Sequence, residues 1–157
     1  MSAVSEPTST QASSCYSIEQ VATRTGLTKR TLRYYEEMGL LPPAERTEGN
    51  YRRYSEEDIQ RLERVKELRD LLGFSLSEIR EILNVEEERG TIREAFRVET
   101  DENAKVAHLD RADELILQQI GLVEQKIAAL EQMRASLYTK LERHREKKQV
   151  LNHLHNN

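Results

Sequence analysis

Apolar residues recur with helical spacing in the first part of the chain. Those at positions 18, 21 and 22 predict a helix that Ser17 caps and Gly26 ends. A second helix is predicted to begin after Thr28, another capping residue, and to run to about Met38. The pattern therefore predicts two short helices joined by a turn that contains glycine, as in a helix-turn-helix unit.

An extended hairpin is predicted after the second helix. Pro42 and Pro43 prevent the helix from continuing and favour an extended strand. Glu48–Asn50, with a glycine at its centre, is typical of a turn, and Tyr51–Tyr54 reads as the returning strand. Because side chains alternate along a strand, residues 52 and 54 share one face and residues 51 and 53 share the other. One face must anchor to the domain, which leaves the other face of this wing free.

Further helical segments follow the hairpin. Ser55 and the three acidic residues after it predict a helix start, and the apolar spacing carries that helix to Gly73. A short helix is expected at Leu76–Leu83, and both helices are expected to pack on the first pair. Residues 85–102 contain an acidic triplet and Gly90, so we interpret them as a connector with some helix.

A long helix is predicted over residues 103–148, where apolar residues form a heptad seam. At 1.5 Å per residue this helix would be on the order of 65 to 70 Å long. It could not bury its seam in its own chain, so we expect a homodimer. Asp113 and Arg134 occupy seam positions, and their opposite charges permit a pairing across the dimer, although the sequence does not fix the register. The apolar seam residues are Leu109, Ile116, Ile120, Val123, Ile127, Leu130, Leu137, Leu141 and Leu151.

Composition supports a mainly α protein with long exposed helices. The chain has 157 residues, of which 33% are charged and only 5% aromatic, so a large globular core is not expected. The net charge of -4 would argue against nucleic-acid binding, but its distribution changes the interpretation. Between Arg24 and Arg53 there are seven basic and four acidic residues, which makes this stretch the candidate electrostatic footprint.

Several classes of protein and site are disfavoured. The single Cys15 cannot form an internal disulfide and fits a reducing cytoplasm. There is no apolar run long enough to span a membrane, and residues 1–14 are expected to be a disordered leader rather than a signal peptide. We expect no metal site and no cofactor, because the histidines are scattered on or beyond the long helix. They are His108, His144, His153 and His155.

The second helix and the wing carry the residues expected to bind duplex DNA. A recognition helix reads bases with side chains near its amino end, while flanking cations and hydroxyls hold phosphates. We expect Tyr34 to reach a phosphate with its hydroxyl group, whereas Tyr35 and Tyr54 are expected to pack in the core. The candidate DNA contacts are Thr28, Lys29, Arg30, Arg33, Tyr34, Arg46, Tyr51 and Arg52.

Taken together, the segments TGLTKRTLRYYEEMGLL, RTEGNYRRY and LLGFSLSEIREIL, with the terminal helix, closely resemble the MerR family of bacterial transcriptional regulators. The resemblance covers about residues 16–148. It implies a winged helix-turn-helix dimer held by an antiparallel coiled coil, and it implies that Arg30, Arg33, Tyr34, Arg46, Tyr51 and Arg52 contact DNA. It also implies binding between over-spaced promoter elements, which the dimer distorts so that RNA polymerase can use them.

The sequence departs from the family members that sense metals or redox state, because it lacks their cysteines. We therefore expect a non-metal signal, such as a small organic molecule. Its candidate pocket would be lined by Ile92, Phe96, Val98, Val106 and Leu109. The alternative is a DNA-bound scaffolding protein without an effector. No catalytic constellation is recognisable, so an enzyme is not expected.

The predicted organisation has five parts. A disordered leader (1–14) precedes a winged helix-turn-helix domain (15–84), a connector (85–102), a coiled-coil dimerisation helix (103–148) and a flexible tail (149–157).

Overall fold

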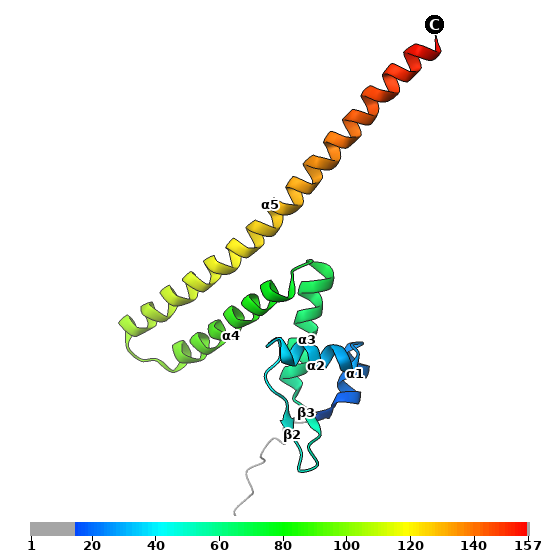
Figure 1. Cartoon of the computed structure of the whole chain (residues 1–157). Coiled ribbons are helices and arrows are strands. Elements are labelled where there is room, and N and C mark those ends of the chain that lie inside the picture. Colours follow the sequence, from blue (N-terminus) through cyan, green and yellow to red (C-terminus); the bar gives the residue numbers. More distant parts are fainter. Residues whose placement is uncertain (1–14, 157) are drawn as a thin grey trace, which may run out of the picture. The chain divides into compact units, whose positions relative to one another are not determined.

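The computed structural model describes residues 15–156, so the expected disordered leader lies outside the described residues. The described chain is mainly helical, as predicted, with one small sheet (Figure 1). It divides into two compact units, whose boundary falls between Leu83 and Asn84. Each unit is described by itself below.

The first unit begins with the two predicted short helices, α1 (Ile18–Thr25) and α2 (Lys29–Glu37). Ser17 caps α1 in a reciprocal capping box with Gln20, and Gly26 ends the helix with φ of 70°. Thr28 caps α2, its hydroxyl oxygen accepting the backbone N–H of Thr31 at 3.1 Å. The predicted helices and their capping residues are thus confirmed.

A three-stranded antiparallel sheet contains the wing. Its order is β1 (Tyr16–Ser17), β3 (Arg52–Tyr54), β2 (Glu45–Arg46), and β2 and β3 form the predicted hairpin (Figure 1). The turn between them uses Asn50, whose φ of 62° lies in the left-handed region that asparagine tolerates. Strand β1 was not predicted, and it attaches the start of α1 to the wing.

The third helix starts as predicted, with Ser55 and Asp58 forming a capping box at the start of α3 (Glu56–Lys66). The helical path continues as a π-helical segment, η1 (Glu67–Leu71), and a turn at Gly73 follows. The helices of this unit enclose a core made largely of their predicted apolar faces. Its fully buried members include Val21, Leu32, Tyr35, Leu40, Leu62, Val65, Leu68 and Ile79.

Helix α4 (Leu76–Val98) corrects the prediction for residues 84–98. The expected short helix does not end at Leu83, and the expected connector 85–102 is mostly helical. Gly90 does not break the helix, because a single glycine costs only about 1 kcal/mol in a helix interior and packing outweighs it. Tertiary contacts with the next helix hold this part of α4. Only Glu99–Asp101 remains as a connection.

Helix α5 (Glu102–His155) is capped by Asp101, whose carboxylate accepts the N–H of Ala104 at 2.8 Å. It confirms the predicted long helix but extends through most of the expected flexible tail 149–157. The sequence after Gly121 contains neither proline nor glycine to stop it. No helix in the described part of the chain is long and apolar enough to cross a membrane.

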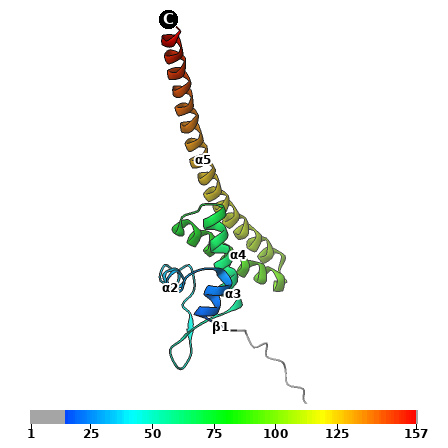
Figure 2. The same cartoon turned by 90° about the vertical axis from the view of Figure 1, so that its right-hand side faces the viewer.

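The second half of α4 runs antiparallel beside the first half of α5 (Figure 2). Two contacts across this hairpin are an ion pair from Arg111 to Glu88 at 2.8 Å and a hydrogen bond from Arg89 to Gln119 at 3.1 Å. Leu115 is buried at the same level of the helix. One face of α5 is therefore covered by α4.

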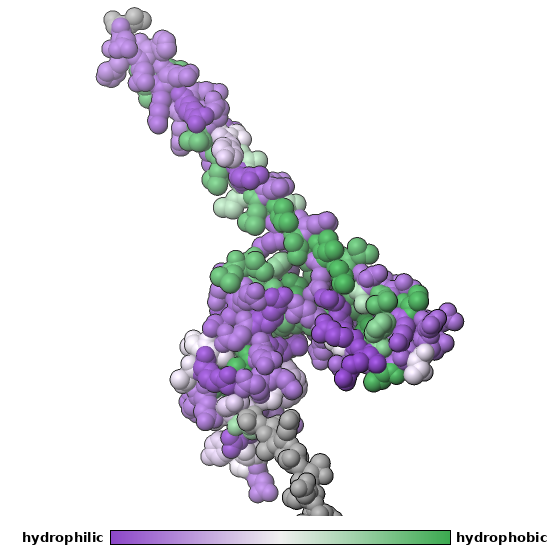
Figure 3. All heavy atoms as spheres, turned by 180° about the vertical axis from the view of Figure 1, so that it is seen from behind, coloured by the Kyte–Doolittle hydropathy of each residue, from purple (hydrophilic) through white to green (hydrophobic). Residues whose placement is uncertain are grey.

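The heptad seam lies on a part of α5 that its own chain leaves exposed. Seven of its apolar residues are 44% to 56% exposed, from Ile120 at the lower limit to Leu130 at the upper. A space-filling view shows hydrophobic residues gathered on the first part of α5 and scattered among hydrophilic ones toward its C-terminal end (Figure 3). Within the described residues, the seam has no intramolecular partner that buries it.

Candidate nucleic-acid interface

Helix α2 has one buried and one exposed side. Leu32 and Tyr35 are buried in the core, and the Tyr35 hydroxyl group is hydrogen bonded by Arg69 of η1. This anchoring leaves Arg30, Arg33 and Tyr34 exposed on the remaining surface of the helix. The exposed side therefore carries two guanidinium groups and a phenol, as a recognition helix requires.

The first residues of α2 also make local bonds. The hydroxyl groups of Thr28 and Thr31 lie 2.8 Å apart. Lys29 forms an ion pair with Glu19 of α1, with 2.8 Å between Nζ and Oε1, and this hydrogen bond lowers the pKa of the Glu19 carboxyl. Both partners are exposed, so the pair links α1 to α2 weakly. Thr28 and Lys29 remain at the surface at the start of α2.

The tip of the wing presents Tyr51, which is 75% exposed. Its ring lies close over Gly49, where an added Cβ would come within 2.9 Å of Cε2, so a side chain there would displace the ring. Arg46 of β2 donates hydrogen bonds from Nη1 to the backbone oxygen of Asn50 at 3.2 Å and to its side-chain oxygen at 3.4 Å. The arginine thus holds the turn that carries Tyr51.

The alternation predicted for β3 is confirmed, and the face that carries Arg52 and Tyr54 is the one anchored to the domain. Tyr54 is 1% exposed, and burial raises the pKa of its hydroxyl group, which has no hydrogen-bond partner among residues 15–156. Arg52 is half-buried and forms an ion pair with Glu36 of α2, with 3.0 Å between Nε and Oε2. The wing and α2 are therefore joined directly.

The same alternation exposes Arg53, which was absent from the predicted contacts. Arg53 lies opposite Ser17 in the sheet, and it borders a depression of about 680 Å³ between the wing and the two helices. The signal that could have found it was present in the sequence, since it shares a strand face with Tyr51. The depression is lined by Ser17, Ile18, Glu19, Arg33, Thr47, Asn50, Tyr51, Arg52 and Arg53.

The cations of this surface are only partly neutralised by the protein. Among residues 15–156, no carboxylate forms an ion pair with Arg30, Arg33, Arg46 or Arg53. Exposed guanidinium groups with free donors bind phosphate oxygens well, because the planar group can donate two parallel hydrogen bonds. The arrangement can thus hold a polyanion against α2 and the wing.

Three of the five residues predicted to line an effector pocket are exposed, and the other two are half-buried. Ile92 and Phe96 are half-buried on α4, and Lys105 of α5 lies over the Phe96 ring with Nζ 5.4 Å from its centroid. By contrast Val98, Val106 and Leu109 are exposed. Only the first pair is thus packed inside the α4–α5 hairpin.

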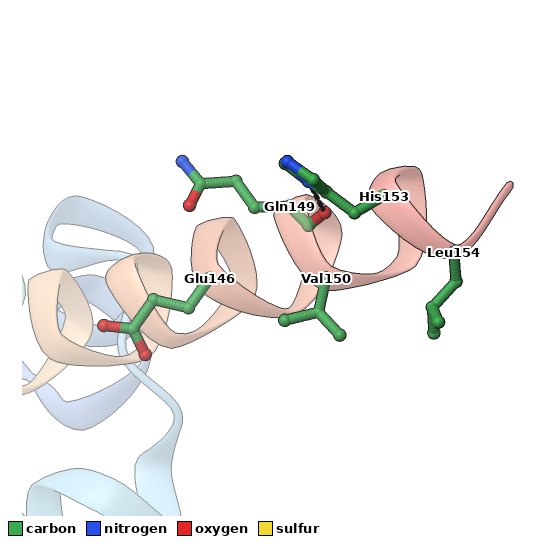
Figure 4. Close-up of a pocket in the computed structure, with 5 residues that line it drawn as sticks. All are labelled: Glu146, Gln149, Val150, His153 and Leu154. Atoms are coloured by element: carbon green, nitrogen blue, oxygen red, sulfur yellow. Dashed lines mark hydrogen bonds between the residues drawn. The ribbon is translucent and has the colours of Figure 1, made fainter. Parts of the chain in front are cut away.

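The histidines show no ligand cluster. Among residues 15–156, no three side chains of histidine, cysteine, aspartate or glutamate are grouped so that they could hold a metal ion. His153 lies 2.9 Å from the backbone oxygen of Gln149 on the same helix. Neighbouring side chains point to different sides of the last turns of α5, so this end forms an open surface (Figure 4). Cys15 is exposed and unpaired.

Comparisons with known proteins identify the family of the chain. Residues 16–86 match the model of a family described as MerR HTH family regulatory protein. The chain is 37% identical over 120 residues to the HTH-type transcriptional regulator YfmP of Bacillus subtilis, an alignment that covers 76% of this chain and 86% of that protein. It is also 34% identical over 120 residues to heavy metal-dependent transcription regulator 2 of Rhizobium meliloti, covering 76% and 70% of the two chains.

This chain spans less than half the length of another relative and most of the length of a solved structure. The HTH-type transcriptional activator TipA of Streptomyces coelicolor is 38% identical over 118 residues, which are 74% of this chain and 40% of TipA. Among solved structures, HiNmlR, a MerR family regulator lacking the sensor domain and bound to promoter DNA, is 23% identical with a TM-score of 0.42. The structural match covers 81% of this chain and 92% of that one.

Proposed function

This chain belongs to the MerR family of DNA-binding transcriptional regulators, and we propose that it acts as a homodimer that distorts promoter DNA in response to a small non-metal molecule. In this proposal, α2 of each subunit enters a major groove, and each wing holds the adjacent phosphates. RNA polymerase then uses a promoter whose elements the distortion realigns.

The observation that carries the proposal is the joint arrangement of α2 and the wing. The ion pair between Arg52 and Glu36 ties these elements to each other. Their exposed residues include Arg33, Tyr34 and Tyr51, which are not required for the core. A rigidly connected helix and hairpin that both display phosphate-binding groups support recognition of a duplex rather than of an isolated phosphate.

The dimer is supported by the exposed seam of α5. A single helix of 54 residues with an apolar stripe on its surface would be prone to associate, and a second copy offers a matching stripe. Dimerisation also fits a palindromic site, because each half-site then receives one α2. We propose the antiparallel coiled coil that the family resemblance implies.

The proposal of a non-metal signal rests on the thiol content of the sequence. Soft metals are held by thiolates, and this chain has only Cys15. We propose that a small organic molecule binds near Ile92, Phe96, Val98, Val106 and Leu109, where exposed apolar residues of the α4–α5 hairpin would meet the partner subunit. Such a ligand would be recognised through apolar contacts and the cation of Lys105 above Phe96.

The first test is to select binding sites from genomic fragments with the purified protein and to map them by footprinting. A palindrome between over-spaced promoter elements, with transcription by RNA polymerase altered in vitro, is the expected result. Binding without any effect on transcription would instead favour the effector-independent scaffolding protein. Absence of sequence-specific binding would refute the DNA-binding proposal.

The effector proposal has a separate test. A ligand that binds only the folded protein raises its melting temperature by mass action, so a panel of organic compounds and metal salts can be compared by thermal shift. We expect stabilisation by an apolar organic compound that weakens when Phe96 is replaced by alanine. A stabilising metal salt would contradict the proposed signal.

A further inference from the structure

Helix α2 carries its charges in the reverse of the order that its own dipole favours. Anions are stabilised at the amino end of an α-helix and cations at the carboxyl end. The basic residues of α2 are Lys29, Arg30 and Arg33, all within its first five positions. Glu36 and Glu37 end the helix, and no basic residue lies in its last turn. A helix of nine residues with this pattern depends on the rest of the fold to hold its carboxyl end.

Two arginines from the helical segments after the wing bond to this end of α2. Arg61 of α3 donates from Nε to the backbone oxygen of Leu40, just beyond the helix, at 2.6 Å. Arg69 of η1 donates from Nη1 to the hydroxyl group of Tyr35, and its guanidinium carbon lies 5.9 Å from the centre of that ring. Asp70 holds the same guanidinium group, with 2.8 Å between Nε and Oδ1. Cations from other elements thus lie where α2 has none of its own.

A third arginine reaches the cap of α2 from the start of α4. Arg80 donates from Nη1 to the backbone oxygen of Met38, the residue that caps α2, at 3.4 Å. Its Cδ lies 3.7 Å from the place that a Cβ on Gly39 would occupy, so the side chain follows the turn after the helix. Arg80 and Met38 both belong to the first compact unit. We call Arg61, Arg69 and Arg80 the arginine clamp.

We propose that the arginine clamp positions α2 for sequence-specific binding, and that Arg69 and Arg80 act on binding without contacting DNA. The inference rests on the proposed entry of α2 into a major groove. Tyr35, which Arg69 holds, is the neighbour of the predicted contact Tyr34, and their rings lie 6.4 Å apart. A shift of Tyr35 therefore also moves Tyr34. Base recognition requires side chains held to within a fraction of an ångström, so the clamp contributes to specificity.

Three roles of the clamp predict different results. An arginine that binds a phosphate lowers the affinity for every sequence and reduces the slope of log K against log salt by about one when it is removed. An arginine that only stabilises the fold lowers the free energy of unfolding but leaves binding by the folded protein unchanged. A positioning arginine lowers the affinity for the operator more than that for unrelated DNA, and it leaves the salt slope unchanged.

Arg80→Ala is the first test. We expect operator affinity to fall by about tenfold, the scale of one lost base contact, whereas affinity for unrelated DNA of the same length changes by less than about twofold. Arg80→Lys keeps a cation that can donate to the Met38 oxygen, so it should recover most of the loss. Arg93→Ala on α4 is the matched control, because Arg93 is exposed and its removal costs the same charge. Denaturant unfolding gives the folded fraction to which each affinity refers.

Tyr35→Phe is the second test, because it removes the hydroxyl group that Arg69 bonds to and keeps the ring. Operator affinity should fall again with the salt slope unchanged. Adding Arg69→Gln to this variant should cause little further loss, since Arg69 acts through that hydroxyl group. Losses that simply add would overturn the role of Arg69. Amide hydrogen exchange should become faster at the carboxyl end of α2 and stay unchanged in α1, which identifies local loosening.

Failure of the clamp and failure of the proposed function are distinguishable. Wild-type protein is measured first on the site selected from genomic fragments. If it binds no specific site, the proposed function is wrong and the positioning role is wrong with it. If it binds its site and the Arg80→Ala and Tyr35→Phe proteins bind that site equally well, only the positioning role is wrong. A salt slope reduced by Arg80→Ala would instead make Arg80 a phosphate contact and would also overturn the proposal.

Discussion

Arg52 in the wing and Glu36 in α2 form an ion pair, with 3.0 Å between Nε and Oε2, in which both side chains are largely shielded from solvent. Within residues 15–156 this is the only ion pair of Arg52, so its two Nη atoms remain available as donors. Glu36 also accepts a bond from the backbone N–H of Ala44 at 3.5 Å. The carboxylate therefore fixes the guanidinium group on the wing without occupying all of it.

Replacing Arg52 by alanine should abolish tight operator binding without unfolding the protein. Loss of one phosphate contact should reduce the slope of log K against log salt by about one. Stability should fall by about 1 to 3 kcal/mol, because Glu36 is left shielded and unpaired. Salt titrations and denaturant unfolding measure both effects. The control Glu36→Gln retains the Arg52 charge and should keep the wild-type salt slope; an unchanged slope for Arg52→Ala would remove this residue from the DNA contacts.

Arg53→Ala should weaken operator binding and lower the salt slope by about one, although the sequence alone did not place Arg53 among the contacts. The reason is its exposed position on the strand face of Tyr51, without an ion pair within residues 15–156. Arg143→Ala on α5 is the matched control for loss of one exposed positive charge. Equal effects of the two substitutions would mean that only the net charge matters.

The seam substitutions Val123→Asp and Ile127→Asp, introduced together, should give a monomer in sedimentation at low micromolar concentration. Four carboxylates would otherwise be buried without partners in each dimer, a cost of several kcal/mol. Leu117→Asp is the control, because Leu117 is exposed on α5 but lies outside the seam. A dimer that survives the double substitution would show that the seam is not the interface.

Cys15→Ser and truncation after Leu151 should leave operator affinity and any inducible response intact. Cys15 is a single exposed thiol, and His153 and His155 lie on the end of a helix that has no third ligand within the described residues. Transcription from the native promoter can be measured with copper, zinc, mercury and an oxidant. A strong metal response that either change removes would reveal a metal site.

Leu32→Ala should reduce the free energy of unfolding by about 2 to 5 kcal/mol, the usual cost of truncating a fully buried leucine. Leu32 is completely buried on the core-facing side of α2, so the loss also loosens the position of this helix. Denaturant unfolding measures the loss in free energy of unfolding. Operator binding, measured at a denaturant concentration well below the unfolding midpoint, reports the loosened position of α2. Leu27→Ala, at a half-buried site in the preceding turn, should cost less.

The helices were predictable because their start signals are local. Ser17, Thr28 and Ser55 each accept a backbone N–H three residues ahead, and the apolar faces follow at once. The continuation of α4 was not predictable in the same way. Gly90 resembles a break when read locally, and the contacts that hold the helix come from residues of α5 more than twenty positions away.

The exposure of the candidate residues was predictable, but their connections within the fold were not. Exposed cations on α2 and the wing follow from the period of each element. The pairing of Glu36 with Arg52 joins residues 16 positions apart, and that of Lys29 with Glu19 joins residues 10 positions apart, so both depend on tertiary structure. Strand β1 is similarly defined by its pairing with β3, since two residues give no pattern of their own.

The seam of α5 has a geometric consequence for the shape of a pair. An α-helix has 3.6 residues per turn, whereas the seam repeats every 3.5 residues on average, so the stripe drifts by about 20° around a straight helix with each heptad. Between Leu109 and Leu141 the drift amounts to about a quarter of a revolution. Two straight helices would separate their stripes before reaching the ends of this stretch. Copies that bury it fully must wrap around each other with a left-handed twist, so the final curvature of α5 is a property of the pair and not of either subunit.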